Sequence, residues 1–166
     1  MKYISSVISA CLLLILVILI ASAALKCDHE EMGKIFTFQF EGSTAASRVK
    51  PFCKNCNHYF GYSIFRGTPE DSSYLEVIEK HSGVSEIVGG EHYTMTAIVT
   101  LADYDFGKTR IGCKVEKDDI IVEFSVEFRE EFEESVALYD EGDEITFRGK
   151  LYDAGFGFTD CELIIE

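Results

Sequence analysis

The C-terminal half of the chain alternates apolar and polar side chains over five successive segments. In the third segment, Ile120, Val122 and Phe124 alternate with Ile121 and Glu123, so one face is apolar and the other mostly acidic. This period of two is typical of a strand with one buried face. Gly and Asp residues interrupt the pattern as turns. We therefore expect five strands, over residues 93–101, 109–115, 120–128, 144–152 and 158–165.

A short helical pattern separates the third and fourth of these segments. Phe132, Val136 and Tyr139 recur at helical spacing between glutamates, and Gly142 follows as a stop signal. Three strands, a helix and two strands follow the plan of a five-stranded OB-fold barrel, which carries its helix between strands three and four. The sequence thus predicts a mainly β protein whose fold narrows its function towards ligand binding.

Two smaller elements precede the barrel pattern. Thr68-Pro69 offers a helix start, and apolar residues then recur at helical spacing to about His81, so we expect a helix over 69–81. Upstream, residues 34–40 alternate as a strand. We divide the chain into an N-terminal segment (1–24), a Cys-containing β segment (27–67) and an OB-fold domain (68–166).

The end of the chain also resembles a known family. Glu141–Gly149 and Phe158–Ile164 are similar to the closing motifs of the bacterial tRNA_anti-like OB-fold proteins, and Gly112–Val115 lies where that family often has a cysteine. The resemblance covers about residues 69–166, and residues 27–67 do not match it. It implies an exported OB-fold module whose ligand is mostly unknown, rather than tRNA binding.

The N-terminus predicts export. No charged residue occurs from Tyr3 to Leu25, Lys2 precedes this run, and Ala21–Ala23 offers a signal-peptidase site. Cleavage would release a soluble domain, whereas 23 uncharged residues can also span a bilayer about 30 Å thick. Signal peptide and membrane anchor therefore both stay open for residues 1–24. In either case we expect residues 27–166 outside the cytoplasm.

The net charge argues against nucleic acid as a partner. The chain carries 29 acidic and 15 basic residues, a formal net charge of -14. Proteins that bind nucleic acid need Lys and Arg along the phosphate backbone, because neutralisation of phosphates dominates their affinity. The histidines are dispersed, and no nucleophile elbow or phosphate loop occurs. We expect a non-enzymatic module that binds a small ligand or a protein, with the membrane as a further partner if the N-terminal segment is retained.

Two cysteines fall on predicted barrel strands. Cys113 lies on the second strand and Cys161 on the fifth, and disulfides are common in exported proteins. We favour a disulfide between them, because strands far apart in sequence can face each other across a small barrel. The alternative is a pair of buried free thiols, which pack as small hydrophobic groups.

The sharpest chemical motif is Cys53-x-x-Cys56. Such a turn points two sulfurs into one pocket, as tetrahedral zinc requires, and Cys27 and His29 are a candidate second pair of ligands. The run from Cys53 to Phe60 is also similar to one knuckle of a zinc ribbon. Two other interpretations stay open. One is a structural disulfide or free thiols, and the other is a redox dithiol, although no helix follows to lower the pKa of the thiol.

Three functions follow from these patterns. The first is an exported or membrane-tethered OB-fold binding module of unknown ligand. The second is a metal-binding or thiol redox protein centred on Cys53 and Cys56. The third is a structural envelope protein that binds another protein through an exposed sheet edge. We favour the first, since no constellation of residues in the chain reaches the pattern of an enzyme.

Overall fold

The computed structural model describes residues 27–39, 46–103, 109–152 and 157–165. The predicted signal or anchor segment, residues 1–24, lies outside this described part, as do residues 104–108 and 153–156, where the sequence predicts turns. No helix within the described part is both long and apolar enough to cross a membrane. In order, the elements are β1 (Met32–Thr37), β2 (Ser47–Cys53), β3 (Ser63–Phe65), α2 (Ser73–Ser82), β4 (His92–Asp103), β5 (Arg110–Lys117), β6 (Ile120–Phe128), the 3-10 turn η1 (Glu130–Phe132), α3 (Glu133–Val136), β7 (Glu144–Leu151) and β8 (Gly157–Leu163).

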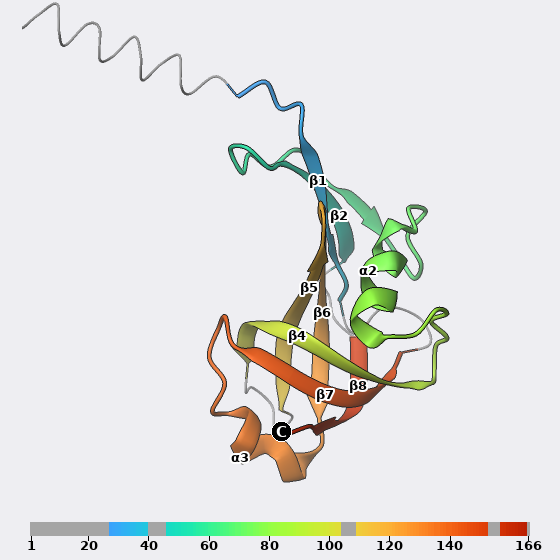
Figure 1. Ribbon diagram of the computed structural model, residues 1–166, viewed down its shortest axis with the longest axis vertical. Coiled ribbons are helices and arrows are strands. Elements are labelled where there is room, and N and C mark those ends of the chain that lie inside the picture. Colours follow the sequence, from blue (N-terminus) through green and yellow to red (C-terminus); the bar gives the residue numbers. More distant parts are fainter. Residues whose placement is uncertain (1–26, 40–45, 104–108, 153–156, 166) are drawn as a thin grey trace, which may run out of the picture.

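Five of the strands close into a barrel. β4 pairs with β5 and β7, β5 pairs with β6, and β7 pairs with β8, all antiparallel. β8 then pairs in parallel with β6 and closes the ring. β1 joins β6 in parallel, and β2 and β3 continue the sheet beyond it (Figure 1). The prediction of a mainly β protein with a five-stranded barrel is confirmed, and three extra strands, called the extension below, are attached to it.

β6 connects the barrel to the extension. One of its edges pairs with β5 over almost its whole length. The opposite edge is divided between two strands: Ile120–Glu123 pairs with Lys34–Thr37 of β1, and Ser125–Phe128 pairs with β8. β6 also has the bounds that its alternating sequence predicts, because both halves present the same apolar face to one core.

The core fills the barrel and continues under the extension. Phe158 contacts Phe124 and Phe147 edge to face, with ring centroids 5.7 and 5.1 Å apart. Tyr74 of α2 belongs to the same core and extends it towards β1. The centroid of its ring lies 5.4 Å from that of Phe36. Burial of these large aromatic side chains provides much of the hydrophobic stabilisation of a chain this small.

Both predicted helices differ from their patterns. α2 begins later than expected because the Asp71 carboxylate accepts a hydrogen bond from the backbone N–H of Ser73 at 3.0 Å, which holds the preceding residues in a turn. It ends as predicted at Gly83, with φ 69°. The helix expected over 129–139 is reduced to η1 and the four-residue α3. Closely spaced glutamates repel one another there, and only Val136 is buried in these two elements.

The structure corrects the disulfide predicted in the barrel. Cys113 and Cys161 are free, buried thiols, with no disulfide at bonding distance in the described part of the chain. β5 and β8 lie on opposite edges of β6, and two strands with a third between them are roughly 9 to 10 Å apart. A disulfide needs Cα atoms within about 7 Å of each other. Burial raises the pKa of Cys113 to about 12, so this thiol stays protonated and packs as a small apolar group.

The extension is fastened to the barrel at the turn between β5 and β6. The backbone N–H of Lys34 donates to the Asp119 carbonyl at 2.8 Å, and Lys54 Nζ contacts the Asp119 carboxylate at 2.5 Å. Gly33 makes this approach possible, since a Cβ there would lie 2.6 Å from the Phe52 ring and 2.8 Å from the same carbonyl. The extension and the β5–β6 turn therefore touch backbone to backbone.

Replacing Gly33 tests this close approach. We expect Gly33→Ala to lower the free energy of unfolding by about 1 to 3 kcal/mol, because the added methyl overlaps backbone as well as a ring. Gly61→Ala is the matched control, since a Cβ at that position meets nothing within 4 Å. Urea denaturation of both variants gives the comparison, and equal midpoints would contradict the contact.

Candidate metal centre

Cys53 ends β2 and starts a tight turn. The backbone N–H of Asn57 donates to the Cys53 carbonyl at 2.8 Å, and the Cys53 N–H donates to the His58 carbonyl at 2.9 Å. Asn57 adopts the left-handed backbone region, with φ 56°, which Asn tolerates better than most residues. These two hydrogen bonds close a tight turn, which brings Cys56 close to Cys53.

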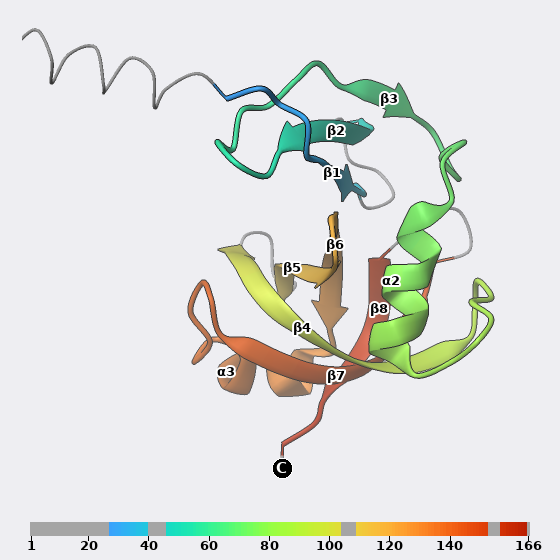
Figure 2. The same ribbon diagram turned by 45° about the horizontal axis from the view of Figure 1, so that its top comes forward.

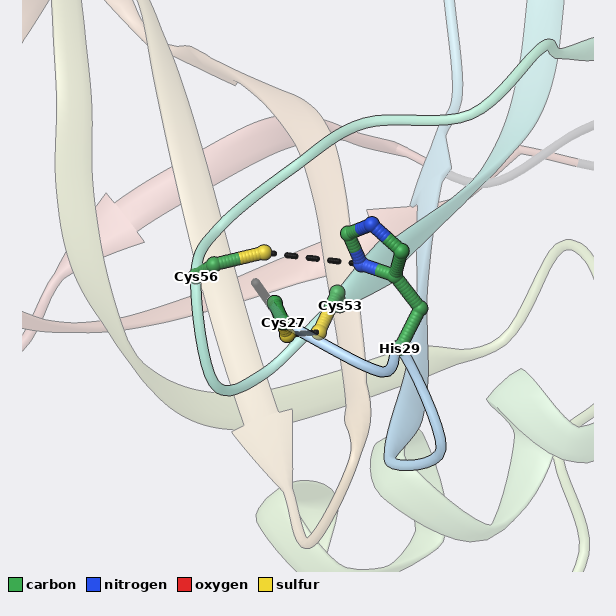
Figure 3. Close-up of side chains that lie close together, drawn as sticks. All are labelled: Cys27, His29, Cys53 and Cys56. Atoms are coloured by element: carbon green, nitrogen blue, oxygen red, sulfur yellow. Dashed lines mark hydrogen bonds between the residues drawn. The ribbon is translucent and has the colours of Figure 1, made fainter. Parts of the chain in front are cut away.

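The segment before β1 lies along this turn (Figure 3). β1 pairs antiparallel with β2, and the backbone N–H of Lys54 donates to the carbonyl of Glu31 at 3.0 Å. His29 also adopts the left-handed region, with φ 56°. That conformation costs roughly 1 to 3 kcal/mol for a residue with a side chain and is found mostly where a site needs it. It places Cys27 and His29 beside the C-x-x-C turn.

The four side chains converge on one point. Cys27 Sγ lies 3.3 Å from Cys53 Sγ, and Cys56 Sγ lies 3.5 Å from His29 Nδ1. All four potential ligand atoms lie within 4.8 Å of one another. Around tetrahedral zinc, sulfur ligands at about 2.3 Å from the metal are about 3.8 Å from each other. The observed separations are close to this edge length, so the group could hold a metal ion such as zinc.

The same distances exclude a disulfide within the cluster as it stands. A disulfide joins sulfurs about 2.05 Å apart, whereas Cys27 and Cys53 are in hydrogen-bonding contact and are free. Figure 3 shows the Cys56 sulfur pointing at the ring of His29 and the other two sulfurs meeting beneath it. The arrangement is that of a ligand shell made from two chain segments.

Hydrogen bonding distributes protons unevenly among the thiols. Burial raises the pKa of Cys53, but hydrogen bonds from His29, from Cys27 and from backbone N–H groups of the turn outweigh it and bring the pKa to about 6. For Cys27 the backbone N–H of His29 lowers the pKa, whereas the hydrogen bond with Cys53, burial and Cys56 raise it, to about 11. These shifts favour the thiolate at Cys53 over that at Cys27, and metal binding would release the protons that the ligands still carry.

Neighbouring rings hold the imidazole of His29 in place. Phe60 meets it edge-on, with ring centroids 5.2 Å apart and an interplanar angle of 89°. The ring of His58 lies 5.3 Å from it on another side. Such contacts fix the plane of a ligand and keep Nδ1 directed at Cys56.

The cluster contains all four ligands that the sequence predicts. Cys27 and Cys53 meet although 26 residues separate them, whereas the cysteines of the barrel take no part. The sequence does not point to Asp119. Its carboxylate accepts a hydrogen bond from Lys54 Nζ at 2.5 Å, although the two residues are 65 positions apart. One acid in a turn of acidic residues carries no signal that could have identified it.

The candidate ligand set, three cysteines and one histidine, has the composition of a structural zinc site. Four protein ligands complete a tetrahedral shell and leave no position for substrate. The C-x-x-C turn follows a strand and does not precede a helix, so the lowered pKa of Cys53 comes from hydrogen bonds within the cluster and not from a helix N-terminus. Comparison of the chain with protein-family models, with curated proteins and with solved structures gives no match. What the centre does must therefore be argued from its own geometry.

Two replacements of His29 separate metal binding from packing. His29→Ala removes one of four ligands, and we expect affinity for Zn²⁺ to fall by more than about 100-fold, beyond the loss that an outer-shell contact causes. His29→Cys completes a four-sulfur shell and should retain the metal. Metal content after gel filtration and the absorption spectrum with Co²⁺ measure both effects. Equal metal content in the two variants would contradict the assignment of His29 as a ligand.

Proposed function

We propose that the chain is an extracytoplasmic OB-fold binding module whose extension holds a structural zinc ion. The strand order of the barrel is the observation that carries this proposal. Its first strand, β4, pairs with its fourth, β7, and its third, β6, pairs in parallel with its fifth, β8. η1 and α3 connect the third and fourth barrel strands, where an OB-fold has its helix. The resemblance to the tRNA_anti-like proteins points in the same direction.

The outer side of β4, β5 and β6 is the surface that we assign to the ligand. OB-folds bind oligonucleotides and oligosaccharides on the face of their second and third strands. A cavity of about 220 Å³ lies on this side, and the end of β1 forms one of its walls. This volume is below the roughly 300 to 1,000 Å³ of sites that enclose a drug-sized ligand. It suits one unit of an extended ligand that runs across the sheet.

The cavity offers hydrogen bonds rather than a net charge. Thr37 donates its hydroxyl to Glu123 at 2.8 Å, and Arg110 is paired with Glu127 at 2.7 Å. Leu101 is 61% exposed and provides an apolar surface at the edge. Residues 68–166 carry 25 acidic and 8 basic residues, which disfavours a polyanion. An uncharged, hydroxyl-rich chain such as an oligosaccharide fits these features best.

The zinc ion supports this surface from a distance. The metal centre holds the residues before β1 against the end of β2, and β1 continues to Thr37 at the wall of the cavity. The extension has only three strands and one apolar face, and a core that small needs a further stabilising link. A structural metal provides one, because binding free energy at such a site is folding free energy.

Binding of a neutral oligosaccharide is the first test of the proposal. We expect chitotriose, cellotriose or maltotriose to bind in calorimetry, while a single-stranded oligonucleotide does not bind at physiological salt. Leu101→Ala should weaken binding about tenfold, equivalent to about 1.4 kcal/mol. Leu138→Ala is the matched control, since Leu138 is equally apolar, highly exposed and outside the cavity. Oligonucleotide binding that weakens steeply with salt, or no binding of any of the three sugars, would contradict the proposed ligand class.

Removal of the metal is the second test. After chelation we expect hydrogen exchange to accelerate in β1, β2 and β3, while the amides at the β4–β7 pairing stay protected, because the barrel is closed without the extension. Cys113→Ala provides the control with an intact ligand set and should respond to chelator as the unchanged chain does. Uniform protection before and after chelation would contradict a structural role.

A further inference from the structure

We propose that the outer face of the extension lies on the surface of an anionic membrane. This inference rests on the proposed location outside the cytoplasm and on retention of the apolar segment between Tyr3 and Leu25 as a tether. The outer face is the side of the β1–β2–β3 sheet turned away from α2 and the core. It is defined by three cross-strand pairs, Ile35 with Lys50, Arg48 with Ile64, and Phe52 with Tyr59.

This face carries apolar and basic side chains that do not pack against the core. Ile64 is 61% exposed and Tyr59 is 50% exposed, and Tyr62, between them in sequence, is 60% exposed. Lys50 Nζ lies 4.0 Å from the centre of the Tyr59 ring, so a positive charge and an aromatic ring lie next to each other on this face. Tyrosine with an adjacent cation is the combination that favours the boundary between lipid headgroups and acyl chains.

The charge of the extension differs from that of the barrel. Residues 27–67 contain five basic and four acidic residues, against eight basic and 25 acidic residues in 68–166. Within them, residues 46–67, which include β2 and β3, contain four basic residues and no acidic one, although Lys54 is paired with Asp119. Each Lys or Arg near an anionic lipid surface increases binding by roughly fivefold at low screening. The acidic barrel is repelled by the same surface. Both effects orient the molecule with its extension towards the lipid.

The position of residue 27, where the described part of the chain begins, agrees with this orientation. Figure 2 shows β2 and β3 at the same end of the molecule as the segment that begins at residue 27, with the C-terminus and α3 at the opposite end. Only Lys26 lies between Cys27 and Leu25, the last residue of the apolar run. The two steps along the chain from residue 25 to residue 27 span at most about 7 Å. If that run is held in a bilayer, the extension lies at the surface of the bilayer.

A membrane explains the face better than a strand from another protein. β3 is the edge of the sheet and could accept an added strand. It pairs over only three residues, which gives an added strand few backbone groups to bind. The exposed side chains project from the face of the sheet rather than from its edge. A lipid surface contacts the whole face at once.

A single tryptophan provides the test, because the chain contains none. The full chain with Ile64→Trp is reconstituted in vesicles of phosphatidylcholine and phosphatidylglycerol. Leu138→Trp is the control, since Leu138 is 82% exposed and closely follows α3, which Figure 2 shows at the opposite end of the molecule from β2 and β3. We expect the emission at position 64 to shift to shorter wavelength and to be quenched by brominated acyl chains, and the emission at 138 to do neither. Arg48→Glu combined with Lys50→Glu should reduce the quenching at position 64.

Flotation of the same vesicles keeps the possible failures apart. A chain that floats with the vesicles while its Trp at position 64 stays unquenched retains its tether and overturns the proposed membrane face. If the chain does not float with the vesicles, the proposed tether is overturned as well, but the proposed binding of sugar by the barrel is unaffected. A blue shift at position 64 that appears only with added protein, and not with lipid, would assign the face to a protein partner and overturn the inference.

Discussion

The structure depends on the way in which β6 shares one of its edges between two strands. Its first half pairs with β1 and its second half with β8, while β5 covers the other edge. The barrel is closed only because β8 occupies the second half, and the extension is attached only because the first half is left open to β1. A strand of nine residues thereby joins the barrel and the extension into one sheet around one apolar core.

The extension is too small to have much of a core of its own. Three strands bury one face against α2 and the core, and their other face is open to solvent. Its sulfur and imidazole groups lie where β1 begins and β2 ends, the point farthest along β1 from the cavity. Two residues next to the ligands, or among them, adopt the left-handed backbone region. A turn with that much local strain is stable only where ligands or packing compensate.

The sequence predicts the barrel strands well because their signal is local. Each strand alternates over its own length, and β6 needs no information from elsewhere to define its bounds. The metal ligands are also found locally, as a C-x-x-C pair and a nearby C-x-H pair. Pairing across the molecule carries no such signal. The predicted Cys113–Cys161 disulfide does not form, because the strand order places β5 and β8 on opposite edges of β6. The contact of Lys54 with Asp119 has no sequence signal, because neither residue is unusual in its own segment.

The register of β1 links the positions of the Cys/His cluster, the core and the cavity. Along β1, Phe36 faces the core and Thr37 faces the cavity, and a slip of one residue would exchange these two positions. A three-stranded sheet with one open face resists such a slip weakly. The Cys27, His29, Cys53 and Cys56 cluster brings the chain just before β1 to the end of β2, and the Asp119 carbonyl accepts a hydrogen bond from Lys34 at the first barrel contact. Both contacts oppose a slip of β1, as does its pairing with β2 and β6, so the cluster and the cavity are linked through the register of one strand.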